Sequence, residues 1–448
     1  MKDKWVYFLG IGGIGMSALA RYFLVSGFRV AGYDKTRTPL TEELENEGAL
    51  VHYEDNISHI PDEALAHPDT LYVYTPAISS DHSELLFLRK EGKVLVKRAE
   101  VLGRITETST NFSIAGTHGK TTVTTMLSHL LYQAGWEMSG FMGGISANYQ
   151  SNFISRGSKY SVTEADEYDR SFLQLTPDYA VITSVDADHL DIYGEVAAVV
   201  SGFKAFGVKV RNGGKLIVKY GLPVEADFTY GFNGLADFHI KNLEYHGLEM
   251  TFEFWAMGEK YANISLQMPG THNAENACAA LALAYLGGLS AKDMENAFKN
   301  FKGVKRRFEV VVNSENGILI DDYAHHPSEL QAIIGSVCNH FPDSRIVGVF
   351  QPHLFSRTRD FMEEFAEVLS ELDFCYILPI YPARELPIPG IGAEQIAELM
   401  PSAKVEVVEK EALMEALSGA KFDILLMLGA GDIDQMVKPV AQEIFGVS

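Results

Sequence analysis

Cysteine, basic residues and long apolar runs are all scarce in this sequence, and each shortage excludes a class of protein. The 448 residues include three cysteines, Cys278, Cys338 and Cys375, which lie far apart, so neither a disulfide framework nor a cysteine-pair metal site is indicated. This usage is typical of a reducing compartment, and we expect a cytoplasmic protein. No apolar run of about 20 residues occurs, so we expect no membrane span and no membrane partner.

Basic residues are too few for a protein that binds nucleic acid. The sequence has 37 lysine and arginine residues against 59 aspartate and glutamate residues, which gives a formal net charge of -22. Because phosphate backbones are held by basic surfaces, we expect no nucleic-acid partner. Any anionic ligand must be held by a local arrangement of donors.

The first 20 residues offer a signal peptide as one interpretation. Lys2 and Lys4 precede an apolar stretch that ends in Ala18-Leu19-Ala20, which is a small-x-small cleavage pattern. Cleavage there would remove a glycine loop that belongs to a folded unit, so this interpretation is disfavoured.

The remaining composition is that of a globular protein with several domains. Hydrophobic residues make up 47% of the chain and charged residues 21%, and the length corresponds to about three typical domains. Strand-like and helix-like segments alternate, which predicts an α/β fold with parallel sheets. We place the three domains at residues 1–108, 109–308 and 309–448.

The first domain begins with a strand, a glycine loop, a helix and a second strand. Trp5 to Leu9 is apolar, Gly10 to Gly15 is the loop, Met16 to Val25 is helical, and Phe28 to Tyr33 is extended. This order starts a βαβ unit, and the polar segment Thr106 to Asn111 is expected to be a linker.

The second domain repeats this order around another glycine loop. Phe112 to Ala115 is a short strand, and the helix after the loop has an apolar face with 3.6-residue spacing. Two later strands, Tyr160 to Thr163 and Ala180 to Val185, end in acidic segments. Ligands of open α/β sheets gather at the carboxyl ends of strands, so we expect a binding site there.

The third domain follows Lys305-Arg306-Arg307. Gly317 to Ile320 is expected to be a strand and Pro327 the first residue of a helix. Further strands are expected at Ile346 to Phe350, Phe374 to Leu378 and Asp423 to Leu428.

The first glycine loop, Gly10 to Gly15, satisfies the pattern GxGxxG. Glycines in such a loop let backbone N–H groups approach a diphosphate at a helix N-terminus, and Asp34 ends the next strand, where a ribose-binding acid would stand. Taken alone, this pattern favours an NAD site, while a tight turn without any ligand remains open.

The second glycine loop, Gly116 to Thr122, carries the groups of a phosphate loop. It departs from GxxxxGK[ST] because Ile114 stands where the first glycine would be. Lys120 can reach phosphates, and the Thr121 hydroxyl can ligate Mg²⁺. Glu164 is a suitable further ligand, whereas spacing alone makes His189 more typical of a solvated loop.

Seven further segments complete a resemblance that spans the chain. The phosphate loop GTHGKTT resembles that of the Mur ligase family, and so do the segments EADEYD (Glu164–Asp169), DADHLD (186–191), THNAENA (Thr271–Ala277), GVKRRFE (Gly303–Glu309), DDYAHHPSE (Asp321–Glu329), QPHLFSRTRD (Gln351–Asp360) and GAGD (Gly429–Asp432).

This resemblance implies a fold and two nucleotide sites. The fold would consist of a Rossmann-like first domain, a central P-loop ATPase-like domain and a Rossmann-like third domain that closes on ATP and the amino acid. The first loop would then hold the diphosphate of a UDP-sugar rather than NAD, through Gly10, Gly12, Gly13, Ile14, Gly15 and Asp34. The second loop would bind ATP through Gly116, Thr117, His118, Gly119, Lys120, Thr121 and Thr122.

The same resemblance assigns roles to residues outside the loops. Thr121, Glu164 and His189 would form the magnesium site, which raises His189 above its plain interpretation. His272, Asn273 and Asn276 would contact the adenine side of ATP, and Arg307 and Asp322 would reach the nucleotide from the other side. The residues near the reacting carboxylate and the amino acid would be His326, Arg357 and Arg359. Lys204 is left out of the site, although relatives carry a carbamylated lysine in such a stretch.

The activity that the resemblance implies is ATP-dependent amide formation. GIGGIGMS at Gly10 to Ser17 and the histidine of the phosphate loop favour members that join L-alanine to UDP-N-acetylmuramate through an acyl phosphate. His326 is the candidate base for the amine, because imidazole titrates near neutral pH. The closest alternative adds a tripeptide to the same sugar nucleotide during murein recycling, and folylpolyglutamate synthetases fit less well.

Two interpretations from other classes remain. An NAD-dependent oxidoreductase would use the first loop, and a nucleotide-binding switch would use the second. The oxidoreductase leaves GTHGKTT and the acidic segments without a role. The sequence leaves open whether the protein is a monomer or a homodimer, and how it selects among alanine, glycine and serine.

Overall fold

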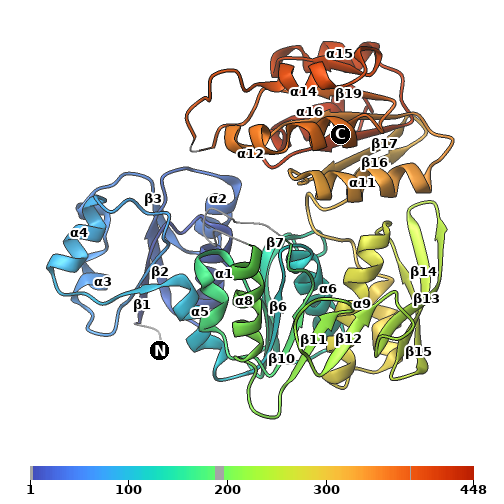
Figure 1. Cartoon of the computed structure of the whole chain (residues 1–448). Helices are drawn as coiled ribbons and strands as arrows, with labels where there is room; N and C mark the ends of the chain where they lie inside the picture. The colour runs from blue at the N-terminus through green and yellow to red at the C-terminus, as the bar shows by residue number, and fades with distance from the viewer. Residues whose placement is uncertain (1–3, 187–195, 384, 448) are drawn as a thin grey trace. The chain divides into compact units, whose positions relative to one another are not determined.

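The computed structural model describes residues 4–186, 196–383 and 385–447, which form three sheets (Figure 1). These residues divide into two compact units. The first unit runs to Leu243 and adds Phe252–Ser265 and Glu275–Phe301. The second takes Glu244–Thr251, Leu266–Ala274 and the chain from Lys302 on.

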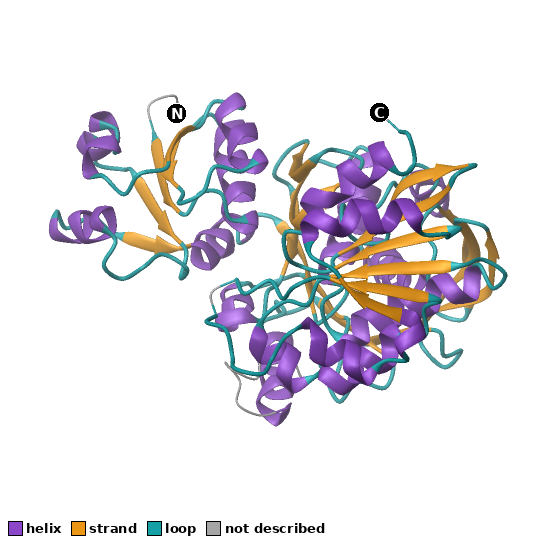
Figure 2. Ribbon diagram, turned by 90° about the horizontal axis from the view of Figure 1, so that it is seen from above, coloured by secondary structure: helices purple, strands orange, loops and turns teal. Residues whose placement is uncertain are grey.

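The first sheet is parallel, with strand order β3-β2-β1-β4-β5. Its strands are β1 (Trp5–Leu9), β2 (Arg29–Tyr33), β3 (Leu50–His52), β4 (Leu71–Tyr74) and β5 (Leu95–Lys97). Its helices, which lie on both faces of the sheet (Figure 2), are α1 (Ile14–Val25), α2 (Pro39–Asn46), η1 (Ile57–His59), α3 (Asp62–Ala66), α4 (Ser83–Lys90) and α5 (Arg98–Thr106). The order of strands reverses at β1 and β4, so the first glycine loop follows β1 at the position where such sheets bind ligands.

The central sheet has ten strands in the order β15-β14-β13-β12-β11-β10-β6-β9-β7-β8. These are β6 (Thr110–Ala115), β7 (Met138–Ser146), β8 (Ser151–Ser155), β9 (Tyr160–Glu164), β10 (Tyr179–Ile182), β11 (Lys215–Lys219), β12 (Phe228–Gly231), β13 (Phe238–His246), β14 (Glu249–Ala256) and β15 (Glu259–Leu266). The accompanying helices are α6 (Lys120–Gln133), η2 (Tyr168–Gln174), α8 (Val196–Gly207), α9 (Thr271–Leu286) and α10 (Ala291–Phe298). β6 pairs in parallel with β9 and with β10, so the segments that follow these three strands meet at one edge.

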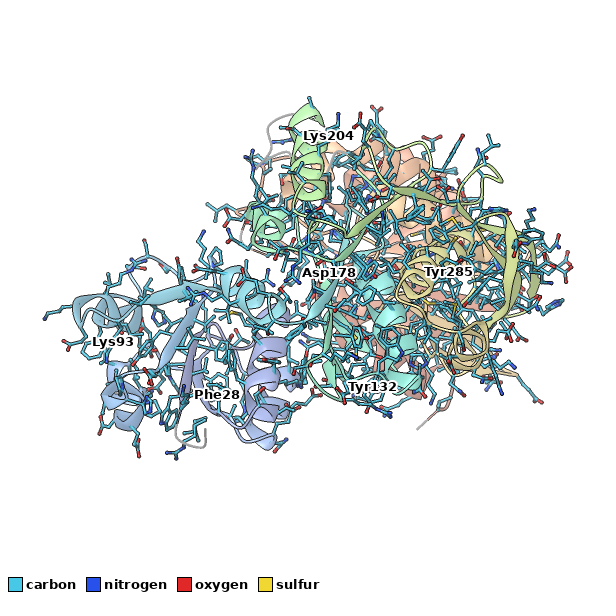
Figure 3. The ribbon with its side chains drawn as sticks, turned by 90° about the horizontal axis from the view of Figure 1, so that it is seen from below. Phe28, Lys93, Tyr132, Asp178, Lys204 and Tyr285 are labelled. Atoms are coloured by element: carbon cyan, nitrogen blue, oxygen red, sulfur yellow. The ribbon has the colours of Figure 1, made fainter. Side chains whose placement is uncertain are left out.

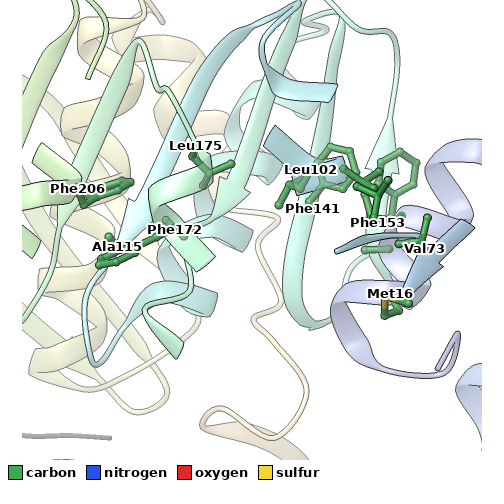
Figure 4. Packing of buried hydrophobic residues seen from close by; sticks show 14 of the residues in the cluster. Met16, Val73, Leu102, Ala115, Phe141, Phe153, Phe172, Leu175 and Phe206 are labelled. Atoms are coloured by element: carbon green, nitrogen blue, oxygen red, sulfur yellow. The ribbon is translucent and has the colours of Figure 1, made fainter. Parts of the chain in front are cut away.

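The first and central sheets share one hydrophobic core inside the first unit. Helix α1 packs against β7 and β8, and the Tyr22 ring lies 5.6 Å from Phe141 and 6.1 Å from Phe153 between centroids. Figure 4 shows Phe141 and Phe153 beside Met16. The predicted boundary at residue 108 therefore falls inside a compact unit, and the division into three domains stays a prediction.

The sheet of the second unit has the strand order β16-β17-β21-β18-β19-β20. Its strands are β16 (Glu309–Ser314), β17 (Gly317–Asp322), β18 (Ile346–Phe350), β19 (Phe374–Ile377), β20 (Val405–Val407) and β21 (Ile424–Leu428). All pairs are parallel except β16 with β17. The helices are α11 (Pro327–His340), α12 (Phe355–Asp360), α13 (Met362–Leu369), α14 (Ala393–Leu399), η3 (Ser402–Lys404), η4 (Lys410–Ala412), α15 (Leu413–Gly419) and α16 (Asp434–Glu443).

The predicted α/β class with parallel sheets is confirmed. β1, α1, β2 and β6 begin and end within two residues of their expected positions, and Gly13 is the N-cap of α1. The predicted linker Thr106 to Asn111 is too long, because Thr106 ends α5 and Thr110 already begins β6. Among the described residues, none of the helices has both the length and the apolar character needed to span a bilayer.

Candidate active site

The phosphate loop turns sharply between β6 and α6, and two of its glycines are required by that turn. Gly116 has φ +139° and Gly119 has φ +82°, in the region that side chains rarely adopt. A Cβ at Gly116 would lie 2.0 Å from Thr183 Oγ1, and one at Gly119 would lie 2.5 Å from Asn276 Oδ1. The structure thus brings Asn276, a predicted ATP contact, against the loop.

Thr183 and Ser184, which directly follow β10, form hydrogen bonds with the phosphate loop and with the residue before it. The Ser184 hydroxyl accepts a hydrogen bond from the His118 backbone N–H at 2.7 Å and lies 2.8 Å from Thr117 Oγ1. Thr183 Oγ1 bonds to the carbonyl of Ala115 at 3.2 Å. Sequence reasoning missed Thr183 and Ser184, because a short Thr-Ser at a strand end is a common pattern.

Lys120 is held in place by a buried carboxylate that sequence reasoning also missed. Its ammonium donates to the Gly116 carbonyl at 2.6 Å and lies 2.8 Å from Glu167 Oε2. The Glu167 side chain is 1% exposed. Burial opposes the charge of Lys120, but attraction to Glu167 and Glu164 outweighs it, so the pKa of Lys120 is raised.

Glu164 and the threonines of α6 supply oxygen atoms at the same edge of the sheet. Glu164 Oε2 accepts the Gly143 N–H at 3.0 Å, and a Cβ at Gly143 would lie 2.2 Å from that oxygen. Thr121 is in the first turn of α6, while Thr122 is buried. Carboxylate and hydroxyl oxygens suit Mg²⁺. The described residues contain no group of three or more His, Cys, Asp or Glu side chains that could hold a metal ion, and His189 lies outside the described residues.

The first glycine loop also has the expected geometry. Gly10 has φ +90°, and a Cβ at Gly12 would lie 2.8 Å from Asp34 Oδ2. Asp34 accepts the Gly12 N–H at 2.7 Å, so the acid at the end of β2 does lie at the loop. Gly13 caps α1 without a side-chain hydrogen bond, and Ile14 and Gly15 form its first turn.

Two of the predicted adenine-side residues belong to the second unit. His272 is half-buried, its Nδ1 lies 3.4 Å from Ser336 Oγ of α11, and desolvation lowers its pKa to about 4. Asn273 is 1% exposed and donates to the Pro269 carbonyl at 2.7 Å. Each of these two side chains therefore has a hydrogen-bond partner within the second unit.

Arg307 and Asp322 lie near one another in the second unit. Asp322 accepts the Phe308 N–H at 2.6 Å and the Ala324 N–H at 2.8 Å. Burial raises the pKa of Asp322 to about 6, although Arg307 opposes the shift. The Arg307 guanidinium lies 3.7 Å from Glu329 and is one-third exposed, so it is accessible to a ligand.

The structure gives His326 a second role and points to its neighbour. His326 is the N-cap of α11, and its Nδ1 accepts the Ser328 N–H at 3.3 Å. A neutral imidazole that accepts at Nδ1 carries its proton on Nε2, so its one basic nitrogen is already engaged in the helix cap. This geometry does not favour His326 as the base.

His325 has the opposite arrangement. Its Nδ1 lies 2.9 Å from the Tyr323 carbonyl and 3.1 Å from Glu329 Oε2, so Nδ1 donates and Nε2 carries the lone pair. Burial is the main cause of its lowered pKa, and Arg357 adds to it, so the ring is neutral near pH 7. His325 and His326 are adjacent in the sequence, so the choice between them as the base depends on the hydrogen bonds seen in the structure.

The two predicted arginines of α12 differ in their surroundings. Arg357 is partly buried, and its charge lowers the pKa of His325 and of His353, in both cases less than burial does. Arg359 is exposed and donates to the adjacent Asp360 at 2.7 Å. Arg357 is therefore the stronger candidate of the two for a contact with a carboxylate.

Lys204 lies away from the phosphate loop. Lys204 is exposed in the last turn of α8, as Figure 3 shows. It lines an open cavity of about 990 Å³ together with Arg211 and Gly214. Gly214 precedes β11, whereas the phosphate loop follows β6. Because β11, β10 and β6 are parallel, the cavity lies at the amino ends of these strands and the loop at their carboxyl ends. This placement supports leaving Lys204 out of the site.

Family models match each part of this arrangement. Residues 6–110 match the model described as Mur ligase family, catalytic domain, and residues 114–284 match the Mur ligase middle domain. Residues 306–431 match the model described as Mur ligase, glutamate ligase domain. The chain belongs to the Mur ligase family. The resemblance found in the sequence is thus confirmed, and with it the use of ATP.

Individual Mur ligases match the chain over its whole length. The UDP-N-acetylmuramate–L-alanine ligase of Christiangramia forsetii is 47% identical over 98% of each chain. The solved UDP-N-acetylmuramate–alanine ligase of Thermotoga maritima has a TM-score of 0.84 and 26% identity, and covers 98% of this chain and 99% of its own. A murein peptide ligase from Psychrobacter arcticus, 22% identical with a TM-score of 0.68, covers 99% of both and shares the fold. The oxidoreductase and switch interpretations are not supported.

Proposed function

We propose that the chain joins L-alanine to the lactyl carboxylate of UDP-N-acetylmuramate, with conversion of ATP to ADP and phosphate, in peptidoglycan biosynthesis. The observation that carries this proposal is the full-length match at 47% identity to a ligase of that name. The position of Lys120 beside the carbonyl of Gly116 in the phosphate loop supports this proposal.

The reaction begins with activation of the carboxylate. A carboxylate oxygen attacks the γ-phosphorus of ATP, the bond to the bridging oxygen breaks, and ADP leaves with that electron pair. The amine of alanine then attacks the acyl carbon, and the carbon–oxygen bond to phosphate breaks. Positioning and neutralisation of charge are the main demands of such a transfer.

Lys120 neutralises phosphate charge in this scheme. In the structure its ammonium is bound to Glu167 and to loop carbonyls, which fixes its position before ATP arrives. Thr121 and Glu164 are the residues that would hold Mg²⁺, because both offer hard oxygen donors at the loop. The metal would supply charge neutralisation at the phosphates.

The amine must lose a proton before it attacks. The sequence makes His326 the candidate base, and the hydrogen bonds of the structure favour His325 instead, whose Nε2 is basic and whose Nδ1–H is oriented by Glu329. Arg357 is the proposed contact for the carboxylate of alanine.

Tripeptide addition to the same sugar nucleotide is the weaker alternative. The murein peptide ligase from Psychrobacter arcticus has a lower TM-score and a lower identity to this chain than the Thermotoga maritima ligase. We also propose that the protein is cytoplasmic, where ATP and UDP-sugars are found, and that it is a monomer or a homodimer, which sedimentation would decide.

Isotope transfer tests the chemistry. With ¹⁸O in the lactyl carboxylate, the acyl phosphate route places one ¹⁸O in each phosphate released during amide formation. Mass spectrometry of the phosphate measures this directly. Phosphate without ¹⁸O alongside amide product would contradict the route.

A further inference from the structure

Arg98 lies against the first glycine loop and has no assigned role. It is the first residue of α5, directly after β5. A Cβ at Gly15 would lie 2.6 Å from Arg98 Nη1 and 3.2 Å from Cζ. The guanidinium therefore rests on the bare backbone of the first turn of α1, and a side chain at Gly15 would displace it.

Most hydrogen-bond donors of Arg98 have no protein partner among the described residues. Its one ion pair there joins Nη2 to Asp166 Oδ2 at 3.6 Å, which is longer than a good hydrogen bond. The side chain is 22% exposed. A guanidinium has five N–H donors in a planar fork that matches phosphate oxygens, so this group is suited to bind an anion.

The loop beneath Arg98 offers an anion site on the same side. The first turn of α1 has no acidic residue, and no side chain caps it. Asp34 already accepts the Gly12 N–H, so the N–H groups left for a ligand are those that follow, where Arg98 lies. A helix N-terminus and a cation that act on one ligand reinforce each other.

We propose that Arg98 binds a diphosphate oxygen of the sugar nucleotide. This inference rests on the proposed function, because it takes the first glycine loop as the UDP site. The ion pair with Asp166 also connects the sugar-nucleotide site to the acidic segment of Glu164 and Glu167. In this proposal Arg98 binds the substrate, and its ion pair with Asp166 places it next to the segment that holds Lys120.

A purely structural role for Arg98 is the alternative, and the neighbouring residue provides its control. Lys97 pairs with Asp169 at 3.2 Å, with side chains 52% and 47% exposed. Lys97→Ala removes a cation and a similar bridge from the same helix start without touching the loop. Asp166→Asn removes the partner of Arg98 but leaves the guanidinium.

Calorimetric titration of the full chain with UDP, and separately with uridine, tests the proposal. We expect Arg98→Ala to weaken UDP binding roughly 10- to 100-fold, as loss of a charged hydrogen bond does, and to leave uridine binding like that of the wild type. Lys97→Ala and Asp166→Asn should bind UDP like the wild type. Equal weakening by Asp166→Asn, or unchanged UDP binding by Arg98→Ala, would overturn the proposal.

Two additional measurements distinguish the diphosphate contact from a carboxylate contact and from a folding defect. If Arg98→Ala weakens UDP-N-acetylmuramate but not UDP, the residue serves the lactyl carboxylate and the diphosphate assignment is wrong. If Arg98→Ala does not fold, Arg98→Lys keeps the charge and loses the fork, so UDP affinity should still fall while the melting temperature stays near that of the wild type. A wild-type chain that binds neither UDP nor UDP-N-acetylmuramate contradicts the proposed function itself.

Discussion

At the scale of single residues, the site depends on how each charge is held. Lys120 and Glu167 form a pair with little access to water, which fixes the ammonium beside the loop carbonyls. A buried charge without its partner is strongly unfavourable, so this pair also supports the local fold.

Replacing Glu167 tests whether it positions the Lys120 ammonium for catalysis without contributing to ATP affinity. We expect Glu167→Gln to lower kcat by roughly 10- to 100-fold, because a misplaced group costs about that much, while the Kd for ATP changes little. Steady-state kinetics measures kcat, and an equilibrium titration with ATP measures the Kd. Asp227→Asn is the control, because it breaks an exposed lysine pair of similar length, Lys215–Asp227 at 3.0 Å, away from the loop. An unchanged kcat in Glu167→Gln would show that Lys120 needs no such partner.

The two adjacent histidines should differ in what they do. His325→Ala should leave ADP formation from the acyl phosphate step intact and depress amide formation, because His325 has the basic nitrogen. His326→Ala should mainly lower stability, by about 1 kcal/mol, through loss of an N-cap. Single-turnover measurements of ADP and amide product check both. The reverse pattern would restore His326 as the base.

Residue types in a motif could be predicted from the sequence, but the partner of each residue could not. The position of Asp34 at the first loop and that of Lys120 in the second loop could be predicted from the spacing of the motifs. Glu167, Ser184 and Arg98 did not, because their roles arise from hydrogen bonds and contacts between segments distant in the chain. Tautomers likewise depend on acceptors that only the fold brings together.

At the scale of elements, the turns between strands and helices set the geometry of both loops. Gly119→Ala should raise the KM for ATP at least about tenfold, because the left-handed backbone is strained and the new Cβ meets Asn276. Gly213→Ala is a matched control with φ +88° and nothing within 4 Å. Both variants should lose stability through the left-handed backbone, Gly119→Ala more because of its clash, and only Gly119→Ala should lose ATP binding. Equal KM values would contradict the contact.

A buried acid of α4 gives the first sheet a dependence on pH. Burial is the main cause that raises the pKa of Glu84 from 4.5 to about 7, and the Tyr7 hydroxyl donates to it at 2.6 Å. The folded state therefore binds this proton more tightly, and the stability that Glu84 contributes below its unfolded pKa is lost as pH rises through about 7.

Urea denaturation at about pH 5 and about pH 8 tests this directly. The wild-type midpoint should fall more between the two values than that of Glu84→Gln, which has no proton to lose. His52 Nε2 lies 3.5 Å from Glu84 Oε1, so the difference between the two proteins reports the titration of Glu84 together with its coupling to His52. Parallel changes in the two proteins would exclude it as the cause.

Elements were predictable where local pattern decides them. The strand before each glycine loop and the helix after it could be predicted from the periodicity of apolar residues and from the glycines that end each segment. The ten-stranded order of the central sheet did not, since the neighbours of a strand are chosen by long-range packing that periodicity does not encode.

At the scale of the whole molecule, the described residues form three sheets, as the alternation of strands and helices indicates, but two compact units, which that alternation does not indicate. The face of α1 that carries Tyr22 packs on Phe141 and Phe153, more than 100 residues away. Family membership could be predicted because motifs from every part of the chain agree.

Phosphate release with ATP, Mg²⁺ and UDP-N-acetylmuramate tests the central claim most directly, with L-alanine compared against L-alanyl-D-glutamyl-diamino acid tripeptide as the amine. We predict release that depends on L-alanine and on the sugar nucleotide, with little stimulation by the tripeptide. Stimulation by the tripeptide alone would move the chain to the recycling reaction, and no stimulation by either amine would contradict the proposed function.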